Sequence, residues 1–430
     1  MGARYRFSTR GGGRDTECLR VRHGGGTQVE IDVTAAGQGF LEPGGHVAGR
    51  VIYPSSAEYF AEFARRAYAA WDRVDPRPAS ETPFSEDTLA WLARAALRST
   101  ERTRWTLLLR AVDDMSATEQ RDPAWTYWRA RALRANAPNG PDGEGARALA
   151  RMTMESIAGP LGFYPQLAQE ELGRRITLPA PLVPLVESER EPVRQHAGLR
   201  RAMRLIALGL RAEGVREWNF SLRGMNDRAL LAAAQRACDA EVWDRCINTS
   251  DRTREEIDID QRFPLPFRKE VIAKANEIGL DPTYVYGLIR QESRFIMDAR
   301  SHVGASGLMQ IMPATARWTA RKIGLNYTQD MIADREVNLR LGTSYLKLVL
   351  DDFGGSQAMA AAAYNAGPNR PRRWREGAFV EAAAWAESIP FNETREYVKK
   401  VLSNAVYYAA LLTGQAPSLK ARLGGAIGPG

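Results

Sequence analysis

The chain has 430 residues, of which 44% are hydrophobic, so length and composition predict two or more domains with apolar cores. It contains no run of about 18 apolar residues, so we expect no transmembrane helix. The net charge of +8 comes almost entirely from arginine, with the first lysine at Lys269. Because no nucleic-acid-binding motif or concentrated basic stripe accompanies this charge, we expect no nucleic-acid partner.

Residues 1–50 differ in composition from the rest of the chain. They hold 12 of the 37 glycines and have almost no helical periodicity. They also lack the apolar core and the small-residue cleavage site of a signal peptide. Because such a segment buries little apolar surface, we expect it to be disordered or poorly packed.

Residues 51–255 are rich in Ala, Leu and Arg and have repeated helical patterns. The periodicity predicts helices over 89–97, 105–115, 125–134, 144–157, 194–213 and 222–238. No clean 34-residue period is present, so we predict an irregular α-helical superhelix rather than a consensus repeat array. We interpret Trp125, Tyr127 and Trp128 as helix-packing core residues rather than platforms for sugar rings. Residues 249–266 are typical of a linker.

The next domain, residues 256–415, begins with a helix that carries an acid on its apolar face. Asp281-Pro282 is typical of an N-cap followed by proline at the first helical position. One face of this helix then carries Val285, Leu288, Ile289 and Glu292. Burial and the helix dipole both raise the pKa of a carboxyl there, which favours a proton donor near neutral pH. The alternative is a helix-end Glu whose side chain points into solvent.

A glycine-containing loop and two more helices follow in the same domain. Residues 301–312 contain two glycines three apart and a short apolar run interrupted by one amide. We predict a helix over 313–322 and a helix of small residues over 358–363. The second ends at Tyr364 and Asn365, so a hydroxyl and an amide lie at a helix C-terminus, a suitable place for groups that face a ligand.

The cysteines and histidines indicate no metal site and no cofactor. Cys18, Cys238 and Cys246 have no metal-ligand spacing and the four histidines are scattered, so we predict no metal and no cofactor. A disulfide between Cys238 and Cys246 is compatible with an oxidising compartment, but we favour buried free thiols. We expect residues 416–430 to be a flexible tail.

Five ordered segments of residues 256–415 resemble the catalytic domain of the soluble lytic transglycosylases of Gram-negative bacteria, which has a goose-lysozyme-like fold. The segments are Glu292-Ser293, 304–313 (GASGLMQIMP), 341–346 (LGTSYL), 363–367 (AYNAG) and 387–398 (ESIPFNETREYV). Residues 125–133 and 162–165 are similar to the superhelix that precedes that domain. The resemblance implies a mainly α fold, with a superhelix followed by a lysozyme-like domain containing a little β structure.

The resemblance implies a reaction with one carboxylate used twice. Glu292 would protonate the oxygen that links N-acetylmuramic acid to N-acetylglucosamine. The ionised Glu292 would then take the proton from the C6 hydroxyl of the same sugar, which closes onto C1 to give a 1,6-anhydro product. No second acid lies within the neighbouring motifs, and Asp298 is the nearest downstream.

Matching to the family residue by residue also implies a set of substrate-binding side chains. These are Ser301, Gln310, Met312, Tyr345, Tyr364, Asn365 and Glu393, with Glu387 as a weaker candidate. Tyr364 would hydrogen-bond the catalytic carboxyl, and Met312 would give an apolar contact. For Glu393 an acid stabilised at a helix N-terminus is an equally good interpretation.

By the same resemblance we expect a periplasmic monomer that acts on peptidoglycan glycan strands. Other cell-wall enzymes are a second class of partner that this resemblance suggests. Since the family usually begins with a signal peptide and a longer helical domain, we expect the chain to be truncated or altered at its start. Two other functions stay open: a glycan-binding or scaffold protein on the same fold, and a hydrolytic lysozyme.

Overall fold

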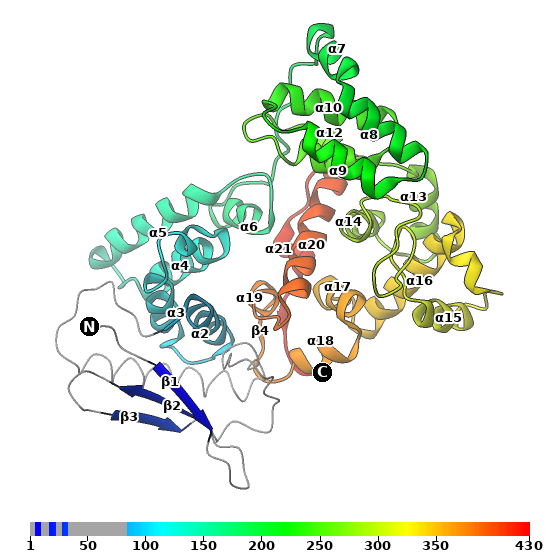
Figure 1. Cartoon of the computed structure of the whole chain (residues 1–430). Coiled ribbons are helices and arrows are strands. Elements are labelled where there is room, and N and C mark those ends of the chain that lie inside the picture. The colour runs from blue at the N-terminus through cyan, green and yellow to red at the C-terminus, as the bar shows by residue number, and fades with distance from the viewer. Residues whose placement is uncertain (1–4, 10–16, 23–27, 33–83) are drawn as a thin grey trace. The chain divides into compact units, whose positions relative to one another are not determined.

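The structure of the protein, a computed structural model, describes residues 5–9, 17–22, 28–32 and 84–430 (Figure 1). The described part is mainly helical, which confirms the predicted fold class. The chain folds into two compact units. The first contains residues 1–157, 369–395 and 425–430, and the second contains 158–368 and 396–424. The boundary that we placed after residue 255 lies inside the second unit.

Near the N-terminus the described residues form a three-stranded antiparallel sheet. Its strands, in the order β1-β2-β3, are β1 (Tyr5–Thr9), β2 (Glu17–Arg22) and β3 (Gln28–Asp32). In the register, Phe7 lies opposite Leu19, and Leu19 lies opposite Ile31. The segment for which we expected disorder therefore has regular backbone at these three places, and the rest of it lies outside the described residues.

The first unit continues with helices that pack on their neighbours in sequence. They are α2 (Glu86–Arg98), α3 (Arg104–Asp113), η2 (Glu119–Arg121), α4 (Pro123–Asn136), η3 (Pro141–Gly143) and α5 (Glu144–Ile157). They confirm the first four predicted helices of the superhelical region. Asp122 caps α4, because its Oδ1 accepts a hydrogen bond from the Ala124 N–H at 2.8 Å. Trp125, Tyr127 and Trp128 are at most 2% exposed, which confirms that they are core residues.

Two later segments complete the first unit. They form α18 (Asn369–Trp374), β4 (Val380–Glu381), α19 (Ala382–Glu387) and β5 (Ala426–Ile427). β4 pairs with β5 in an antiparallel sheet, and α19 packs against α2. Glu387, at the end of α19, is 1% exposed and accepts two hydrogen bonds from the Arg94 guanidinium at 3.1 Å. This buried ion pair fastens α19 to α2.

The second unit begins with a group of short helices. They are α6 (Phe163–Glu171), α7 (Glu187–Gln195), α8 (Ala197–Ala207), α9 (Arg211–Ser221), α10 (Asp227–Asp239), α11 (Trp243–Ser250) and α12 (Ile259–Arg262). Two predictions were wrong here. The single helix over 194–213 is divided among α7, α8 and α9, because the chain turns at His196 and again at Gly209, whose φ is +79°. The helix predicted from residue 222 starts at Asp227, where Asn226 caps it.

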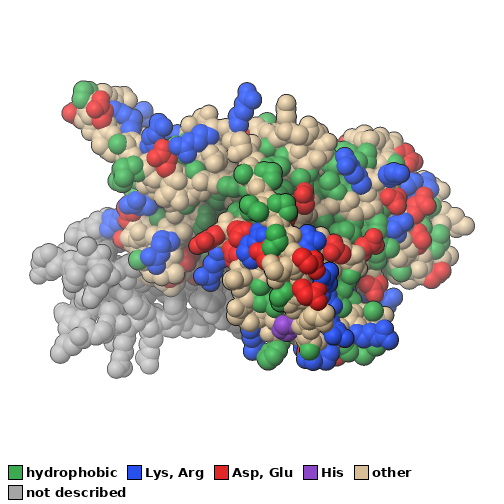
Figure 2. Space-filling model, turned by 90° about the horizontal axis from the view of Figure 1, so that it is seen from above, with side chains coloured by type: hydrophobic (Ala, Val, Ile, Leu, Met, Phe, Trp, Pro, Cys, Tyr) green, Lys and Arg blue, Asp and Glu red, His purple; other side chains and the backbone are tan. Residues whose placement is uncertain are grey.

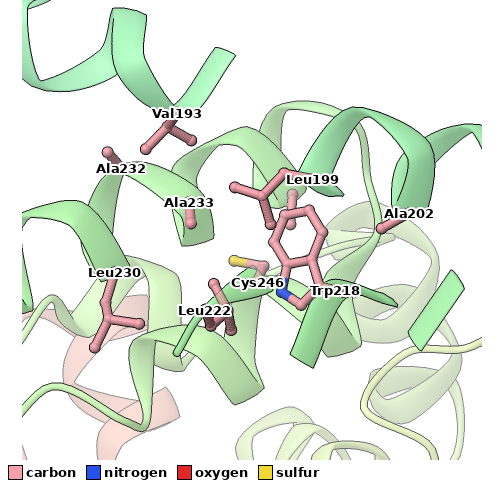
Figure 3. Close-up of a cluster of buried hydrophobic side chains, with 10 residues drawn as sticks. Val193, Leu199, Ala202, Trp218, Leu222, Leu230, Ala232, Ala233 and Cys246 are labelled. Carbon is pink, nitrogen blue, oxygen red and sulfur yellow. The ribbon is translucent and has the colours of Figure 1, made fainter. Parts of the chain in front are cut away.

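The core of these helices surrounds Trp218 (Figure 3). Trp218 and Leu199 are 0% exposed, and the indole N–H of Trp218 donates to Thr249 Oγ1 at 2.9 Å. Cys246 lies in the same cluster and forms a disulfide with Cys238. Our preference for free thiols was therefore wrong. α10 and α11 pack against each other, and this contact brings the two cysteines to a Cα–Cα distance of 5.0 Å, which sequence spacing did not predict.

The remaining helices of the second unit include those that carry the candidate site. They are α13 (Arg268–Glu277), α14 (Pro282–Glu292), α15 (Pro313–Lys322), η4 (Gln329–Ala333), α16 (Arg335–Asp352), α17 (Gln357–Ala366), α20 (Asn392–Thr413) and α21 (Leu419–Leu423). α20 starts in the first unit and continues into the second. A Cβ on Gly287 would lie 2.6 Å from the Val401 carbonyl oxygen, so this glycine permits close contact between α14 and α20.

The residues after 415 are ordered, which corrects the prediction of a flexible tail. Ser418 caps α21, and Leu419 and Leu423 are buried where α21 packs against α6 and α17. The Arg422 guanidinium donates to Asp281 Oδ2 at 2.8 Å and to Gln357 Oε1 at 3.0 Å. Two apolar side chains one helical turn apart and one multiply bonded arginine therefore anchor this segment.

Two surface properties bear on function. Among the helices of the described ranges, none is both long and apolar enough to cross a membrane. On the face drawn in Figure 2, Lys and Arg side chains are interspersed with Asp and Glu. Charges of one sign do not gather on this face, so it lacks the kind of charge cluster that steers charged ligands over a long range.

Candidate active site

The candidate site is built on the C-terminal end of α14. Asp281 caps the helix through Oδ1, which accepts from the Thr283 N–H at 2.8 Å, and Pro282 is its first residue, as predicted. The apolar face is also confirmed, because Val285, Leu288 and Ile289 are all 0% exposed. Glu292 ends this face and is partly exposed. A carboxyl group thus stands at the edge of the core, within reach of solvent and ligands.

Tyr397 on α20 orients the carboxyl of Glu292. Its hydroxyl donates to Glu292 Oε1 at 2.5 Å, across 105 residues of sequence. Burial first, and then the negative charge of Glu292 and this hydrogen bond, raise the pKa of Tyr397 well above its ordinary value. The hydroxyl therefore keeps its proton and acts as a donor throughout the neutral pH range.

Tyr364 lies near the same carboxyl but makes a different hydrogen bond. Its hydroxyl donates to the Met309 carbonyl at 2.8 Å. Its pKa is also raised well above the ordinary value, by burial first and then by the charges of Glu292 and Tyr345. The expected hydrogen bond between Tyr364 and the carboxyl stays a prediction, and the hydrogen bond that the structure shows to Glu292 Oε1 comes from Tyr397.

The loop of residues 299–312 is held from three sides. Ser293, directly after α14, donates through Oγ to the Leu308 carbonyl at 2.7 Å. Tyr364 holds Met309 from α17. On the third side, Asn338 of α16 is 1% exposed, accepts from the Met309 N–H at 2.9 Å, and donates to the carbonyls of Ser306 (2.9 Å) and Ile332 (3.0 Å). The loop therefore has a fixed position relative to Glu292.

Two motif glycines are required by this packing. Gly307 has a φ of +79°, and a Cβ there would lie 2.2 Å from Asn338 Nδ2. A Cβ on Gly342 would lie 2.3 Å from Met309 Sδ. Any larger side chain at either position would displace the loop, which explains both glycines without a direct role in chemistry.

Gln310 and Ser301, two predicted substrate contacts, belong to this loop. Gln310 has a φ of +44°, and its Nε2 donates to the carbonyls of Ala299 (2.9 Å) and Gly307 (2.7 Å). Both amide hydrogens are thus used within the loop, and the amide oxygen is the atom available to a ligand. Ser301 Oγ accepts from the Ala305 N–H at 2.9 Å, so this side chain also shapes the loop.

The apolar candidate Met312 ends the loop, and the aromatic candidate Tyr345 lies next to Tyr364. Met312, the N-cap of α15, is 39% exposed, as an apolar ligand contact requires. The half-buried ring of Tyr345 lies with its centroid 5.3 Å from that of Tyr364. Asn365 is partly buried next to Tyr364, at the end of α17.

The two remaining acids lie in the first unit. Glu393 is exposed in the first turn of α20 and belongs to the first unit, so both interpretations of it stay predictions. Glu387 belongs to the buried ion pair with Arg94, and Arg395 lies 3.7 Å away, so its observed role is structural.

Sequence reasoning missed Tyr397 and Asn338. Tyr397 lies within the last of the five segments, one helical turn after the candidate Glu393. This position was the signal that could have marked Tyr397 as a site residue. Among the described residues, no group of three or more His, Cys, Asp or Glu side chains is arranged to hold a metal ion. The absence of a cofactor stays a prediction.

The fold and the site define a lytic-transglycosylase-like helical protein. The structure is similar to that of an inactive Glu-to-Gln variant of a lytic transglycosylase from Pseudomonas aeruginosa, with a TM-score of 0.71 and 31% identity over 85% of this chain and 58% of that one. It also shares its fold with the 70-kDa soluble lytic transglycosylase of Escherichia coli, with a TM-score of 0.63 and 24% identity over 87% of this chain and 64% of that one.

The family assignment follows from the sequence. Residues 269–384 match the transglycosylase SLT domain, and residues 388–417 match the soluble lytic transglycosylase helical domain. The predicted resemblance is confirmed, and the segment 269–384 belongs to the SLT domain family. A soluble lytic murein transglycosylase of Salmonella typhimurium is 32% identical over 288 residues, which are 66% of this chain and 43% of that protein. The chain thus spans less than half the length of this relative.

Proposed function

We propose that the chain is a lytic transglycosylase of peptidoglycan. In this proposal it cleaves the β-1,4 bond between N-acetylmuramic acid and N-acetylglucosamine and leaves 1,6-anhydromuramic acid ends. The observation that carries the proposal is the carboxyl of Glu292, which ends an apolar helix face, accepts a hydrogen bond from the neutral Tyr397 and lies within the SLT domain. The curated relative bears the name of a murein transglycosylase, and the proposal extends that activity to this shorter chain.

Glu292 performs both proton transfers in the proposed mechanism. It first donates its proton to the glycosidic oxygen, and that bond breaks as the 2-acetamido group helps to stabilise the cationic sugar. The ionised carboxylate then takes the C6 hydroxyl proton, and O6 bonds to C1. Glu292 regains its proton and no water is consumed. Most glycosidases need a second carboxylate at this point, whereas an intramolecular hydroxyl has a large effective concentration.

Tyr397 supports the charge that appears on Glu292 midway through this reaction. A hydrogen bond to the ionised form of a carboxyl stabilises that form, and bonds to charged groups are stronger than bonds between neutral ones. Because the Tyr397 hydroxyl keeps its proton, it donates in both steps. It also fixes the direction of Oε1 while the carboxyl exchanges its proton with the sugar.

The substrate in this proposal is the glycan strand of peptidoglycan, and the compartment is the periplasm. The amide oxygen of Gln310, the hydroxyl of Ser301 and the amide of Asn365 offer polar contacts. Met312 and Tyr345 offer apolar ones. Glu393 joins this set only if the glycan extends along α20. We also propose that the protein acts as a monomer and needs no metal.

The test is the reaction of the purified chain with cell-wall sacculi, followed by mass spectrometry of the released products. Products lighter by one water than hydrolytic fragments support the lyase. Sedimentation with sacculi without release supports a glycan-binding or scaffold protein instead, and reducing ends support a lysozyme. Glu292→Gln is the control, because glutamine has nearly the same shape but cannot exchange the proton; we expect turnover to fall by about a hundredfold or more.

A further inference from the structure

The exposed indole of Trp318 lies in a row of aromatic rings that starts near Glu292. Trp318 is on α15 and is 39% exposed. Its ring meets that of Tyr345 edge to face, with centroids 6.2 Å apart and planes at 90°. Tyr345 in turn contacts Tyr364, whose pKa is raised by burial first and then in part by the negative charge of Glu292. Three contiguous rings therefore connect the catalytic carboxyl to the surface of α15.

The surroundings of Trp318 on α15 are apolar on one side and cationic on the other. The inner side of the helix is formed by Ala316, Thr319 and Ala320, which are at most 2% exposed. Met312, at the start of the helix, is 39% exposed. Lys322, one turn after Trp318, has its ammonium 5.8 Å from the centre of the indole ring.

A single exposed apolar residue is ordinary and needs no function. Phe220 on α9 is an example, because it is 62% exposed and has Arg223 over its ring. Trp318 differs in two respects. The edge contact with Tyr345 braces the indole, and the row of rings leads from Tyr345 to Tyr364, near Glu292.

We propose that Trp318 binds the face of a pyranose ring in the glycan strand, at a position beyond the sugars that react, and that Lys322 pairs with a carboxylate of the attached peptide stem. This inference rests on the proposed function. A pyranose ring presents a flat set of C–H groups, whose positive edges suit the negative face of an indole. A cation next to the indole gives an acidic strand a higher affinity than a neutral one. The gain in affinity is small, because an ion pair between two solvent-exposed charges contributes little free energy.

The experiment measures glycan affinity by calorimetry in Glu292→Gln protein, which cannot consume its ligand. The ligands are peptidoglycan-derived di-, tetra- and hexasaccharides, with and without peptide stems. We expect Trp318→Ala to weaken hexasaccharide binding about tenfold, which corresponds to about 1.4 kcal/mol for the lost ring contact, and to leave the disaccharide nearly unchanged. Trp318→Phe should fall between the two, and Phe220→Ala should bind as the parent does.

Lys322→Gln provides the second measurement. We expect it to weaken the binding of stem-bearing hexasaccharide about two- to threefold and that of the stem-free form not at all. Equal hexasaccharide affinity in Trp318→Ala and its parent would overturn the inference while leaving the proposed function intact. If the parent bound none of these glycans, the proposed function would fail first, and this inference with it. Should Trp318→Ala melt far below its parent, Trp318→Phe decides the question.

Discussion

The hydroxyl of Tyr397 donates to Glu292 Oε1 at 2.5 Å and joins α20 to the acid at the end of α14. The contact is possible because Gly287 lets α14 approach the backbone of α20 at Val401. A residue of the segment that matches the helical domain therefore supplies a hydrogen bond to the acid of the SLT domain.

Tyr397→Phe removes this hydrogen bond and little else. Hydrogen bonds to charged groups are worth about 1.5–3 kcal/mol, so we expect kcat to fall about ten- to a hundredfold, with a smaller change in KM. The matched control is Tyr408→Phe on the same helix, because the Tyr408 hydroxyl is buried without a hydrogen-bond partner among the described residues. Initial rates of product release from sacculi measure both. Equal rates in the two variants would reject a role for Tyr397 in orienting Glu292.

At this site, local sequence patterns predicted the features of α14 but not its tertiary contacts. The cap at Asp281, the apolar face and the position of Glu292 were predicted correctly, because capping and periodicity depend on residues a few positions apart. The bond from Tyr397 spans 105 residues and depends on how α14 packs on α20, which no local pattern records. The buried Asn338 was missed for the same reason.

The fold predictions failed where a turn or a tertiary contact decided the outcome. The helix over 194–213 is interrupted at Gly209, although the apolar periodicity continues through it. The disulfide between Cys238 and Cys246 depends on the packing of α10 on α11. The fixed position of residues 419–427 depends on contacts with residues far away in sequence, namely those of Arg422 with Asp281 and Gln357 and the pairing of β5 with β4.

Asn338→Ala should loosen the loop of residues 299–312. It removes three hydrogen bonds and leaves the Met309 N–H and the Ile332 carbonyl without this partner, whereas the Ser306 carbonyl keeps its hydrogen bond from the Ile311 N–H at 3.1 Å. Since each buried group left unsatisfied costs about 1–3 kcal/mol, we expect a loss of at least 2 kcal/mol in the free energy of unfolding and a lower kcat/KM. The control is Asn404→Ala, because Asn404 is buried but its Nδ2 donates to no described group. Denaturant unfolding that gave the same small loss for both would contradict this role of Asn338.

Stability should fall steeply at high pH. Burial is the largest cause that raises the pKa of several described tyrosines, among them Tyr284, Tyr286, Tyr364, Tyr397, Tyr407 and Tyr408. Each pKa is higher in the folded state than in the unfolded chain, so their contribution is fully present below pH ~10 and is lost as the pH rises above it. Tyrosinate absorbance followed together with circular dichroism measures this. Ionisation of these tyrosines at pH ~10 in the folded protein would contradict it.

Chelation should leave the reaction intact. Across the described ranges, no cluster of three or more His, Cys, Asp or Glu side chains offers a metal site, and Glu292 supplies the acid and base functions in the proposed mechanism. We expect the same rate of product release before and after dialysis against EDTA. A loss of activity that Zn²⁺ or Mg²⁺ restored would show that a metal takes part.

The fate of water distinguishes the proposed lyase from a lysozyme. If the C6 hydroxyl closes onto C1 and Glu292 performs both proton transfers, solvent oxygen never reaches C1. Products formed in H₂¹⁸O should then have unlabelled 1,6-anhydro ends. A hydrolytic reaction would place ¹⁸O at a reducing end, because a water would attack C1 with the help of a second carboxylate or of Glu292 itself. A hen-type lysozyme digest of the same sacculi, run in parallel, shows the label that hydrolysis gives. Labelled reducing ends as the major product would reject the lyase mechanism but would leave the fold and the role of Glu292 as an acid in place.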